Sequence, residues 1–241
     1  MTKGLSLERF KILSGSMLKL IAIITMFIDH TALLLSPQIP LMTVPFFTVG
    51  SHAITLHYVM REIGRLAFPI FCFLVTEGFS HTRSKKRYAF GLLLFAVISE
   101  IPFNVMKSGQ VFNPNYQNIF FTLFLGVLML YVIENVRTEL VKAILLVTIG
   151  VVAVLLKCDY GLSGVLLIVL IYVLKGRPAI QAVLAYPLLS GGIAALTAFI
   201  PINMYNGERG FIKSKAMKYA FYVFYPLHMT ILIAIKLILM H

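Results

Sequence analysis

Long apolar stretches, separated by short clusters of basic residues, dominate this sequence of 241 residues. Hydrophobic residues make up 59% of the chain and charged residues only 12%, which leaves little polar material to cover a water-soluble surface. A helix needs about 20 apolar residues to cross a hydrocarbon core of about 30 Å, and the stretches here are of that size. The sequence therefore predicts an all-α, polytopic integral membrane protein.

The apolar stretches predict about eight transmembrane helices. They cover residues 18–36, 63–80, 89–107, 119–134, 141–156, 162–175, 179–200 and 217–239. Because no sizeable polar region is left over, we expect a single transmembrane domain over residues 1–241 with a short basic N-terminal segment at 1–17. The stretch 37–60 is also apolar but contains three prolines, so we interpret it as an interfacial or re-entrant connection.

Lysine and arginine residues gather in the loops on one side of the predicted spans. They lie before the first span, in loop 82–87, at Arg137 and Lys142, and at Lys175 and Arg177. Since basic loops remain in the cytoplasm, we expect this side and both termini to be cytoplasmic in a bacterial plasma membrane. The net charge of +12 then reflects contact with lipid headgroups, and no nucleic-acid partner is expected.

One basic loop disagrees with this topology. With eight spans, residues 201–216 fall on the outer side although they contain Arg209, Lys213 and Lys215. Either the span at 179–200 is broken, for which Pro187 and the following Gly191-Gly192 are candidates, or the cations of this loop bind a ligand.

Polar side chains within or beside the spans mark candidate functional residues, because such groups are costly in lipid. The predicted topology places most of them on the outer side of the membrane. These are Asp29, His30, Arg61, Glu62, Arg65, Glu100, Gln117, Asn118, Asp159, Tyr160, Asn206, Glu208, Arg209 and His228. A smaller group, which includes Glu77 and Arg83, lies on the inner side. The pattern predicts a polar cavity that is reached from one face.

The histidines have both a structural and a chemical interpretation. Asp29 and His30 can form a capped helix end, or an acid–imidazole pair in which Asp29 orients His30 as a general base. His228 can bond a backbone carbonyl near Pro226, or it can take part in proton transfer. Such pairs also serve proton-coupled transporters, so these residues alone do not name a reaction.

Other candidates have competing structural roles. Glu100 can form a salt bridge with Arg65, and Asp159-Tyr160-Gly161 is typical of a turn. Cys72 and Cys158 are too far apart in sequence to suggest a metal knuckle or a disulfide framework. His52 and His57 are five residues apart, a poor spacing for one helix face, so we predict no metal site.

Several segments resemble the TraX family. Residues 18–30 resemble the first-span signature of that family, and residues 64–82 resemble the second. Shorter motifs follow in the order of the family, at residues 99–103, 117–123, 159–161, 205–210 and 224–228. The resemblance extends from about residue 17 to residue 230.

The resemblance implies a membrane-embedded acyltransferase related to the wider transmembrane acyltransferases. Acetyl-CoA is then the expected co-substrate, with no tightly bound cofactor, and the acceptor is an amine or hydroxyl on pilin or another envelope molecule. A proton-coupled transporter or flippase, and a non-catalytic factor for pilus or conjugation assembly, stay open as alternatives. The acceptor and the oligomeric state are not predicted.

The proposed chemistry assigns roles to individual residues. Catalytic roles are expected for His30, Asp29, His228 and Glu100, with His30 as base and His228 as second base or transient acyl carrier. Substrate or cofactor binding is expected for Arg65, Asn118, Asp159, Tyr160, Arg209 and Tyr225. Arg209, Lys213 and Lys215 would hold the phosphates of coenzyme A. The eight-span topology places these cations outside, whereas coenzyme A is cytosolic.

Overall fold

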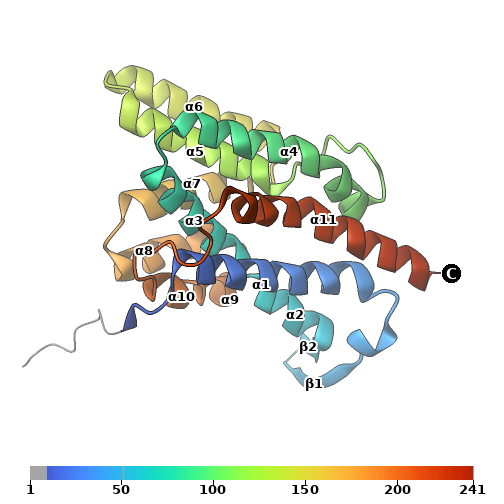
Figure 1. The fold of residues 1–241 in the computed structure, drawn as a ribbon. Coiled ribbons are helices and arrows are strands. Elements are labelled where there is room, and N and C mark those ends of the chain that lie inside the picture. The colour runs from blue at the N-terminus through green and yellow to red at the C-terminus, as the bar shows by residue number, and fades with distance from the viewer. Residues whose placement is uncertain (1–9, 51, 241) are drawn as a thin grey trace, which may run out of the picture.

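Helices account for most of the computed structural model, which describes residues 10–50 and 52–240 (Figure 1). Within those ranges three helices are long and apolar enough to cross a membrane. They are α1 (Gly15–Leu35), α4 (Lys85–Ser108) and α11 (Lys215–Leu239). The prediction of a helical membrane protein is confirmed at this level.

Shorter helices complete the bundle. They are α2 (Leu56–Gly64), α3 (Ala67–His81), α5 (Ile119–Asn135), α6 (Glu139–Leu155), α7 (Gly161–Val173), α8 (Pro178–Ala185), α9 (Gly192–Leu196) and α10 (Phe199–Asn203). Two short 3-10 helices, η2 (Pro40–Met42) and η3 (Tyr186–Leu188), lie between them. The predicted span at 63–80 corresponds to α3 and the end of α2, which are separated by a short break.

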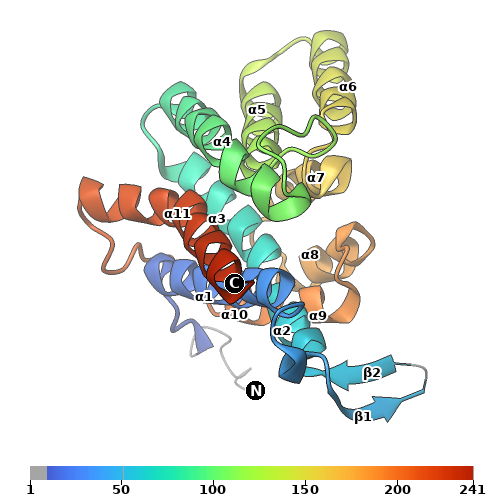
Figure 2. The same cartoon turned by 90° about the vertical axis from the view of Figure 1, so that its right-hand side faces the viewer.

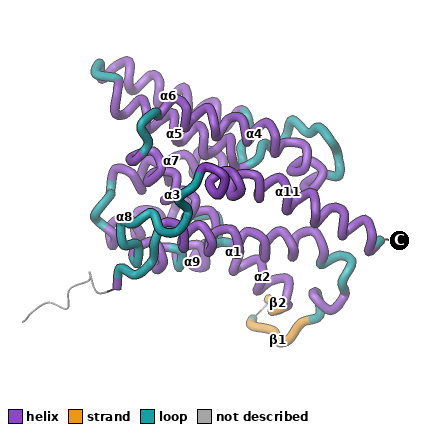
Figure 3. The backbone as a smooth tube through the Cα atoms, viewed as in Figure 1, coloured by secondary structure: helices purple, strands orange, loops and turns teal. Residues whose placement is uncertain are grey.

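The proline-rich stretch 37–60 departs from the all-α prediction. It contains an antiparallel hairpin of β1 (Pro45–Val49) and β2 (His52–Thr55), which lies beside one end of the bundle (Figures 2 and 3). Every residue of β1 is exposed. The hairpin pairs its backbone groups locally, which is how residues 45–49 and 52–55 remain ordered without helix.

The helices run roughly side by side, so the bundle has two ends (Figure 1). At the end where α1 begins, Lys85 of α4 pairs with Glu134 of α5. At the same end Lys175 Nζ, just after α7, lies 2.6 Å from Glu77 Oε1 of α3. We refer to this end, with its cluster of cations, as the basic end. It carries Arg83, Lys85, Lys86, Arg87, Arg137, Lys142, Lys175, Arg177, Arg209, Lys213 and Lys215.

The predicted continuous span at 179–200 is wrong. The segment is divided into α8, η3, α9 and α10, with breaks at Pro187 and at Gly191-Gly192, where Gly192 has φ of +55°. It ends where it began, at the basic end, because the Leu13 N–H donates to the Met204 carbonyl at 2.9 Å. Residues 201–216 therefore lie with the other basic loops and not at the opposite end, as the eight-span topology required.

A glycine allows α5 and α7 to approach closely in the core. At Gly126 of α5 an added Cβ would overlap the Ile168 side chain of α7. At Gly91 of α4 an added Cβ would meet no atom within 4 Å. Small residues at helix contacts let backbones approach closely in membranes, so Gly126 sets the distance between α5 and α7.

Gly126→Val is expected to destabilise the bundle by about 1–3 kcal/mol, the usual cost of overpacking a well-packed core. Gly91→Val is the matched control and should melt like the wild-type protein. Thermal unfolding in detergent can be followed by a thiol-reactive dye, because Cys72 and Cys158 are free and buried. Equal melting of the two variants would show that Gly126 does not set this packing.

Candidate functional site

Two histidines from the long helices α1 and α11 are bonded to each other. Nδ1 of His30 lies 2.7 Å from Nε2 of His228, and the two rings are nearly parallel, with 8° between their planes. Nδ1 of His228 lies 2.8 Å from the carbonyl oxygen of Phe224. A direct pair between imidazoles brings two titratable groups into one polar site within the apolar bundle.

The Phe224 carbonyl determines which nitrogens carry hydrogen. A carbonyl only accepts, so Nδ1 of His228 must donate to it. In the neutral ring Nε2 of His228 is then an acceptor, and Nδ1 of His30 donates to it. This arrangement leaves a lone pair on Nε2 of His30, which can accept a proton from a substrate.

Asp29 was predicted to orient His30, but in the structure it bonds a different residue. Its Oδ2 accepts a hydrogen bond from Arg61 Nη1 at 2.7 Å. Neighbouring residues of a helix point about 100° apart, so Asp29 faces α2 whereas His30 faces α11. His228 holds His30 instead. The predicted bond from His228 to a backbone carbonyl is present, with Phe224 as the acceptor.

Glu100 is held by Asn118 and not by Arg65. Its Oε2 accepts from Asn118 Nδ2 at 2.5 Å and from the Asn118 backbone N–H at 3.3 Å. The other amide hydrogen of Asn118 is donated to the Ala96 carbonyl at 2.7 Å, and its Oδ1 caps α5 at Phe120. Asn118 thus ties α4 to the start of α5, and it has no amide hydrogen left for a substrate.

Asp159 and Tyr160 form the turn before α7, as the sequence predicted. The Asp159 N–H donates to the Gln117 carbonyl at 2.8 Å, and the Thr122 hydroxyl donates to the Asp159 carbonyl. Burial raises the pKa of the Asp159 carboxyl to about 6, although the charge of Lys107 opposes the rise.

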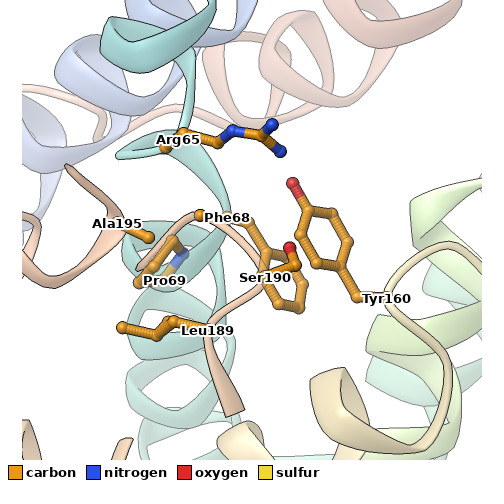
Figure 4. A pocket seen from close by; sticks show the side chains of 8 residues that line it. Arg65, Phe68, Pro69, Tyr160, Leu189, Ser190 and Ala195 are labelled. Atoms are coloured by element: carbon orange, nitrogen blue, oxygen red, sulfur yellow. The ribbon is translucent and has the colours of Figure 1, made fainter. Parts of the chain in front are cut away.

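A narrow crevice lies between Tyr160 and the broken segment 178–203. Figure 4 shows the Tyr160 hydroxyl and the Arg65 guanidinium pointing toward one another. The Tyr160 ring stacks on Phe68 with 3.6 Å between centroids, and an added Cβ at Gly191 would crowd Arg65. The crevice has no room for a ligand, but Nε of Arg65 is buried there and has no hydrogen-bond partner within residues 10–50 and 52–240.

Most of the predicted polar residues gather toward the end opposite the basic end. The Asp159 carboxylate is within electrostatic range of Asp29 and Arg61. The Tyr225 ring lies 5.8 Å from that of His228 and 6.4 Å from that of His30, between centroids. Arg209 and its neighbours are the exception, because the broken segment returns them to the basic end.

A cavity of about 570 Å³ extends from the basic end into the bundle. Its lining includes the cationic residues Lys19, Arg83, Arg209 and Lys218, together with Met26, Ile119, Phe120, Tyr222 and Tyr225 at greater depth. His30 follows Met26 by four residues on α1, and His228 follows Tyr225 by three on α11. The inner end of the cavity is therefore about one helical turn from the histidine pair.

Sequence reasoning missed Lys19 and Lys218 as part of this cavity. The helical spacing of Lys19, Met26 and His30 was a usable signal, since all three lie on one face of α1. Among the residues that the structure describes, no group of three His, Cys, Asp or Glu side chains gathers as a metal site would require.

Asp159→Asn should change how stability depends on pH. The folded-state pKa of about 6 exceeds the ordinary value of 3.8, so the folded protein binds more protons between these values and loses stability as the pH rises through them. The variant should therefore melt higher than wild type at pH 7.5, with a smaller difference at pH 4.5. Circular dichroism in detergent measures both, and a difference independent of pH would contradict the buried carboxylate.

Comparisons with known proteins agree with the resemblance seen in the sequence. The profile of the TraX protein family matches residues 14–236. The chain is 30% identical over 256 aligned residues to "Probable fimbrial assembly protein FimC, serogroup H1" of Dichelobacter nodosus, covering 94% of this chain and 97% of that protein. No solved structure matches the chain. The family match includes both histidines, the cavity and the broken segment, and the chain belongs to the TraX protein family.

Proposed function

We propose that the protein is a membrane-embedded acyltransferase that moves an acetyl group from acetyl-CoA to an amine or hydroxyl acceptor. The observation that carries this proposal is the bonded pair of His30 and His228, which leaves Nε2 of His30 as a proton acceptor. Acyl transfer to an amine or hydroxyl needs a base of this kind. Membership of the TraX family and the cavity that leads toward the pair support the same chemistry.

The transfer can be written as one addition and one elimination. The acceptor nitrogen or oxygen attacks the thioester carbonyl carbon while Nε2 of His30 removes its proton. The resulting oxyanion collapses, the carbon–sulfur bond breaks, and the proton on His30 passes to the departing sulfur. The products are the acetylated acceptor and free coenzyme A. Positive charge on His30 is shared with His228, whose Nδ1–H is held by the Phe224 carbonyl.

Arg65 is the candidate for stabilising the oxyanion. Asn118 does not serve as an oxyanion donor in this proposal, because both of its amide hydrogens are already donated. Arg65 lies near Tyr160 (Figure 4), and its buried Nε bonds no group in the part of the chain that the structure describes. Because the crevice beside Arg65 has no room for a ligand, this role requires the guanidinium to turn toward the histidine pair when the thioester is bound.

The acceptor that we propose first is a pilus subunit. The relative from Dichelobacter nodosus is named as a fimbrial assembly protein, and an exposed N-terminal amine is a chemically suitable acceptor. A non-catalytic assembly factor is the second candidate function, because the same name does not require catalysis.

The topology that fits these observations places the basic end in the cytoplasm of a bacterial plasma membrane. In this proposal α1, the pair α2 and α3, α4, α5, α6, α7 and α11 each cross, whereas residues 178–203 enter and return. Irregular backbone at that depth is tolerated when protein covers it, as Arg65 covers Gly191. Arg209 then faces the cytosol, where coenzyme A is found.

Fusions at the C-terminus test this topology. With one crossing fewer than the sequence predicted, the C-terminus is outside, so a fused alkaline phosphatase should be active and a fused green fluorescent protein dark. In the loop at Gly207, which faces the cytosol in this proposal, a fused alkaline phosphatase should be inactive and a fused green fluorescent protein fluorescent. A fluorescent C-terminal fusion would restore the topology with both termini inside and remove this proposal.

His30→Ala should lower the acetyl-transfer rate by about 100-fold or more, the usual contribution of a general base. Purified protein in liposomes, labelled acetyl-CoA and mass spectrometry of acceptor peptides provide the measurement. His52→Ala, at an exposed position of β2, is the matched histidine control. Full activity of a properly inserted His30→Ala protein would exclude this base, and normal pilus assembly by a His30→Ala, His228→Ala double variant would favour the assembly factor.

A further inference from the structure

One face of α1 leads from the basic end directly to the histidine pair. Lys19, Ile23, Met26 and His30 are separated by four, three and four residues, the spacing of neighbours on one helix face. The first three line the cavity, and His30 continues the same row. The distance from Lys19 to His30 along the helix is about 17 Å.

A matching row follows α11. Lys218, Tyr222 and Tyr225 line the same cavity, and His228 follows in the same direction. Each row therefore begins with a lysine at the mouth and ends with one histidine of the pair. Between these ends the side chains are apolar or aromatic, so the cavity suits a molecule with a charged head and a long narrow arm.

Four cations of the cavity lining lack acidic partners among residues 10–50 and 52–240: Lys19, Arg83, Arg209 and Lys218. Glu77 also lines the cavity, but it is paired with Lys175 and His81. Lys19, Arg209 and Lys218 form the group at the mouth. None of the ion pairs within those ranges includes Lys19, Arg209 or Lys218. Arg209 and Lys218 are the charges that act on Lys19. Like charges held together at a cavity mouth repel one another, and a bound polyanion would relieve that repulsion.

The loop that carries Arg209 is fixed to the start of α1. Ser16 donates to the Arg209 carbonyl through both its hydroxyl, at 2.6 Å, and its backbone N–H, at 3.0 Å. Gly210, at φ of +80°, packs so closely on Ser14 that a side chain there would overlap it. Arg209 is therefore held at the cavity mouth by backbone contacts and needs no ligand to keep it there.

The geometry points to this cavity as the donor site, which takes an acyl thioester of coenzyme A. Its phosphates lie on Lys19, Arg209 and Lys218, and its pantetheine arm runs between α1 and α11 toward His30 and His228. This inference rests on the proposed function. It also replaces Lys213 and Lys215 as phosphate ligands, because neither lines the cavity. An anionic phospholipid presents similar phosphate chemistry and is the alternative source that the test separates.

Equilibrium binding of unacylated coenzyme A tests the assignment without turnover. The protein is placed in nanodiscs of phosphatidylcholine, and binding of tritiated coenzyme A is measured. Lys19→Ala, Arg209→Ala and Lys218→Ala should each raise Kd by about tenfold or more, because each removes a charge-assisted contact. Arg209 and Lys218 are exposed, so their loss does not endanger folding. The controls Lys213→Ala and Lys215→Ala should stay within about twofold, as expected for surface charges.

Three other binding results would overturn the assignment. Equal weakening by the control variants would indicate general surface attraction. Loss of coenzyme A binding when phosphatidylglycerol is added would indicate that the cavity is a lipid site. An absence of binding in phosphatidylcholine nanodiscs would indicate that coenzyme A has no site there. His30→Ala should leave Kd unchanged, which separates binding from chemistry. If coenzyme A binds through the three cations but no acceptor is acetylated, the cavity assignment stands and the proposed function falls. If the Lys19→Ala and Arg209→Ala proteins transfer acetyl groups with the wild-type KM for acetyl-CoA, the proposed function stands and the cavity assignment falls.

Discussion

A polar side chain within lipid depth has no water to bond, so it must find a partner inside the protein. The hydrogen bond between His30 and His228 meets that requirement for two imidazoles at once, and the Phe224 carbonyl completes the chain. Because each hydrogen bond in this series has a defined donor, the remaining ring nitrogen, Nε2 of His30, is an acceptor. The two imidazoles and the Phe224 carbonyl thus set both the position of the His30 ring and the protonation of its nitrogens. The chemical proposal depends on this arrangement more than on any other contact in the bundle.

The path of residues 178–203, which return to the basic end and do not cross the bundle, connects the remaining features. When residues 178–203 return to the basic end, Arg209 lies beside Lys19 and Lys218 at the mouth of the cavity. In the eight-span interpretation that cation was on the wrong side for a cytosolic donor. The observed path gathers the basic loops at one end, with the cavity opening among them and the histidine pair beyond its inner end. The proposed donor site, the proposed orientation in the membrane and the proposed base are therefore consistent with one another.

The sequence predicted the long helices well, because length and hydropathy suffice for α1, α4 and α11. Hydropathy could not predict the path of residues 179–200, since an apolar segment that returns has the same composition as one that crosses. Pro187 and Gly191-Gly192 did mark the break. The hydrogen-bond partners of the polar side chains were less predictable. Adjacency suggested that Asp29 serves His30, but helix geometry directs Asp29 to Arg61, and Glu100 bonds Asn118 and not Arg65. Those pairings depend on distances between helices, which no local pattern contains. The cavity was missed although the spacing of Lys19, Met26 and His30 was visible.

The protonation pattern of the histidine pair is open to direct measurement. Nitrogen-15 NMR of protein labelled at histidine reports which ring nitrogen carries hydrogen, and single His30→Gln and His228→Gln variants assign the two signals. We expect both residues to carry hydrogen on Nδ1, with coupling between Nδ1 of His30 and Nε2 of His228 across their hydrogen bond. Signals showing hydrogen on Nε2 of His30, or no coupling between the rings, would contradict it.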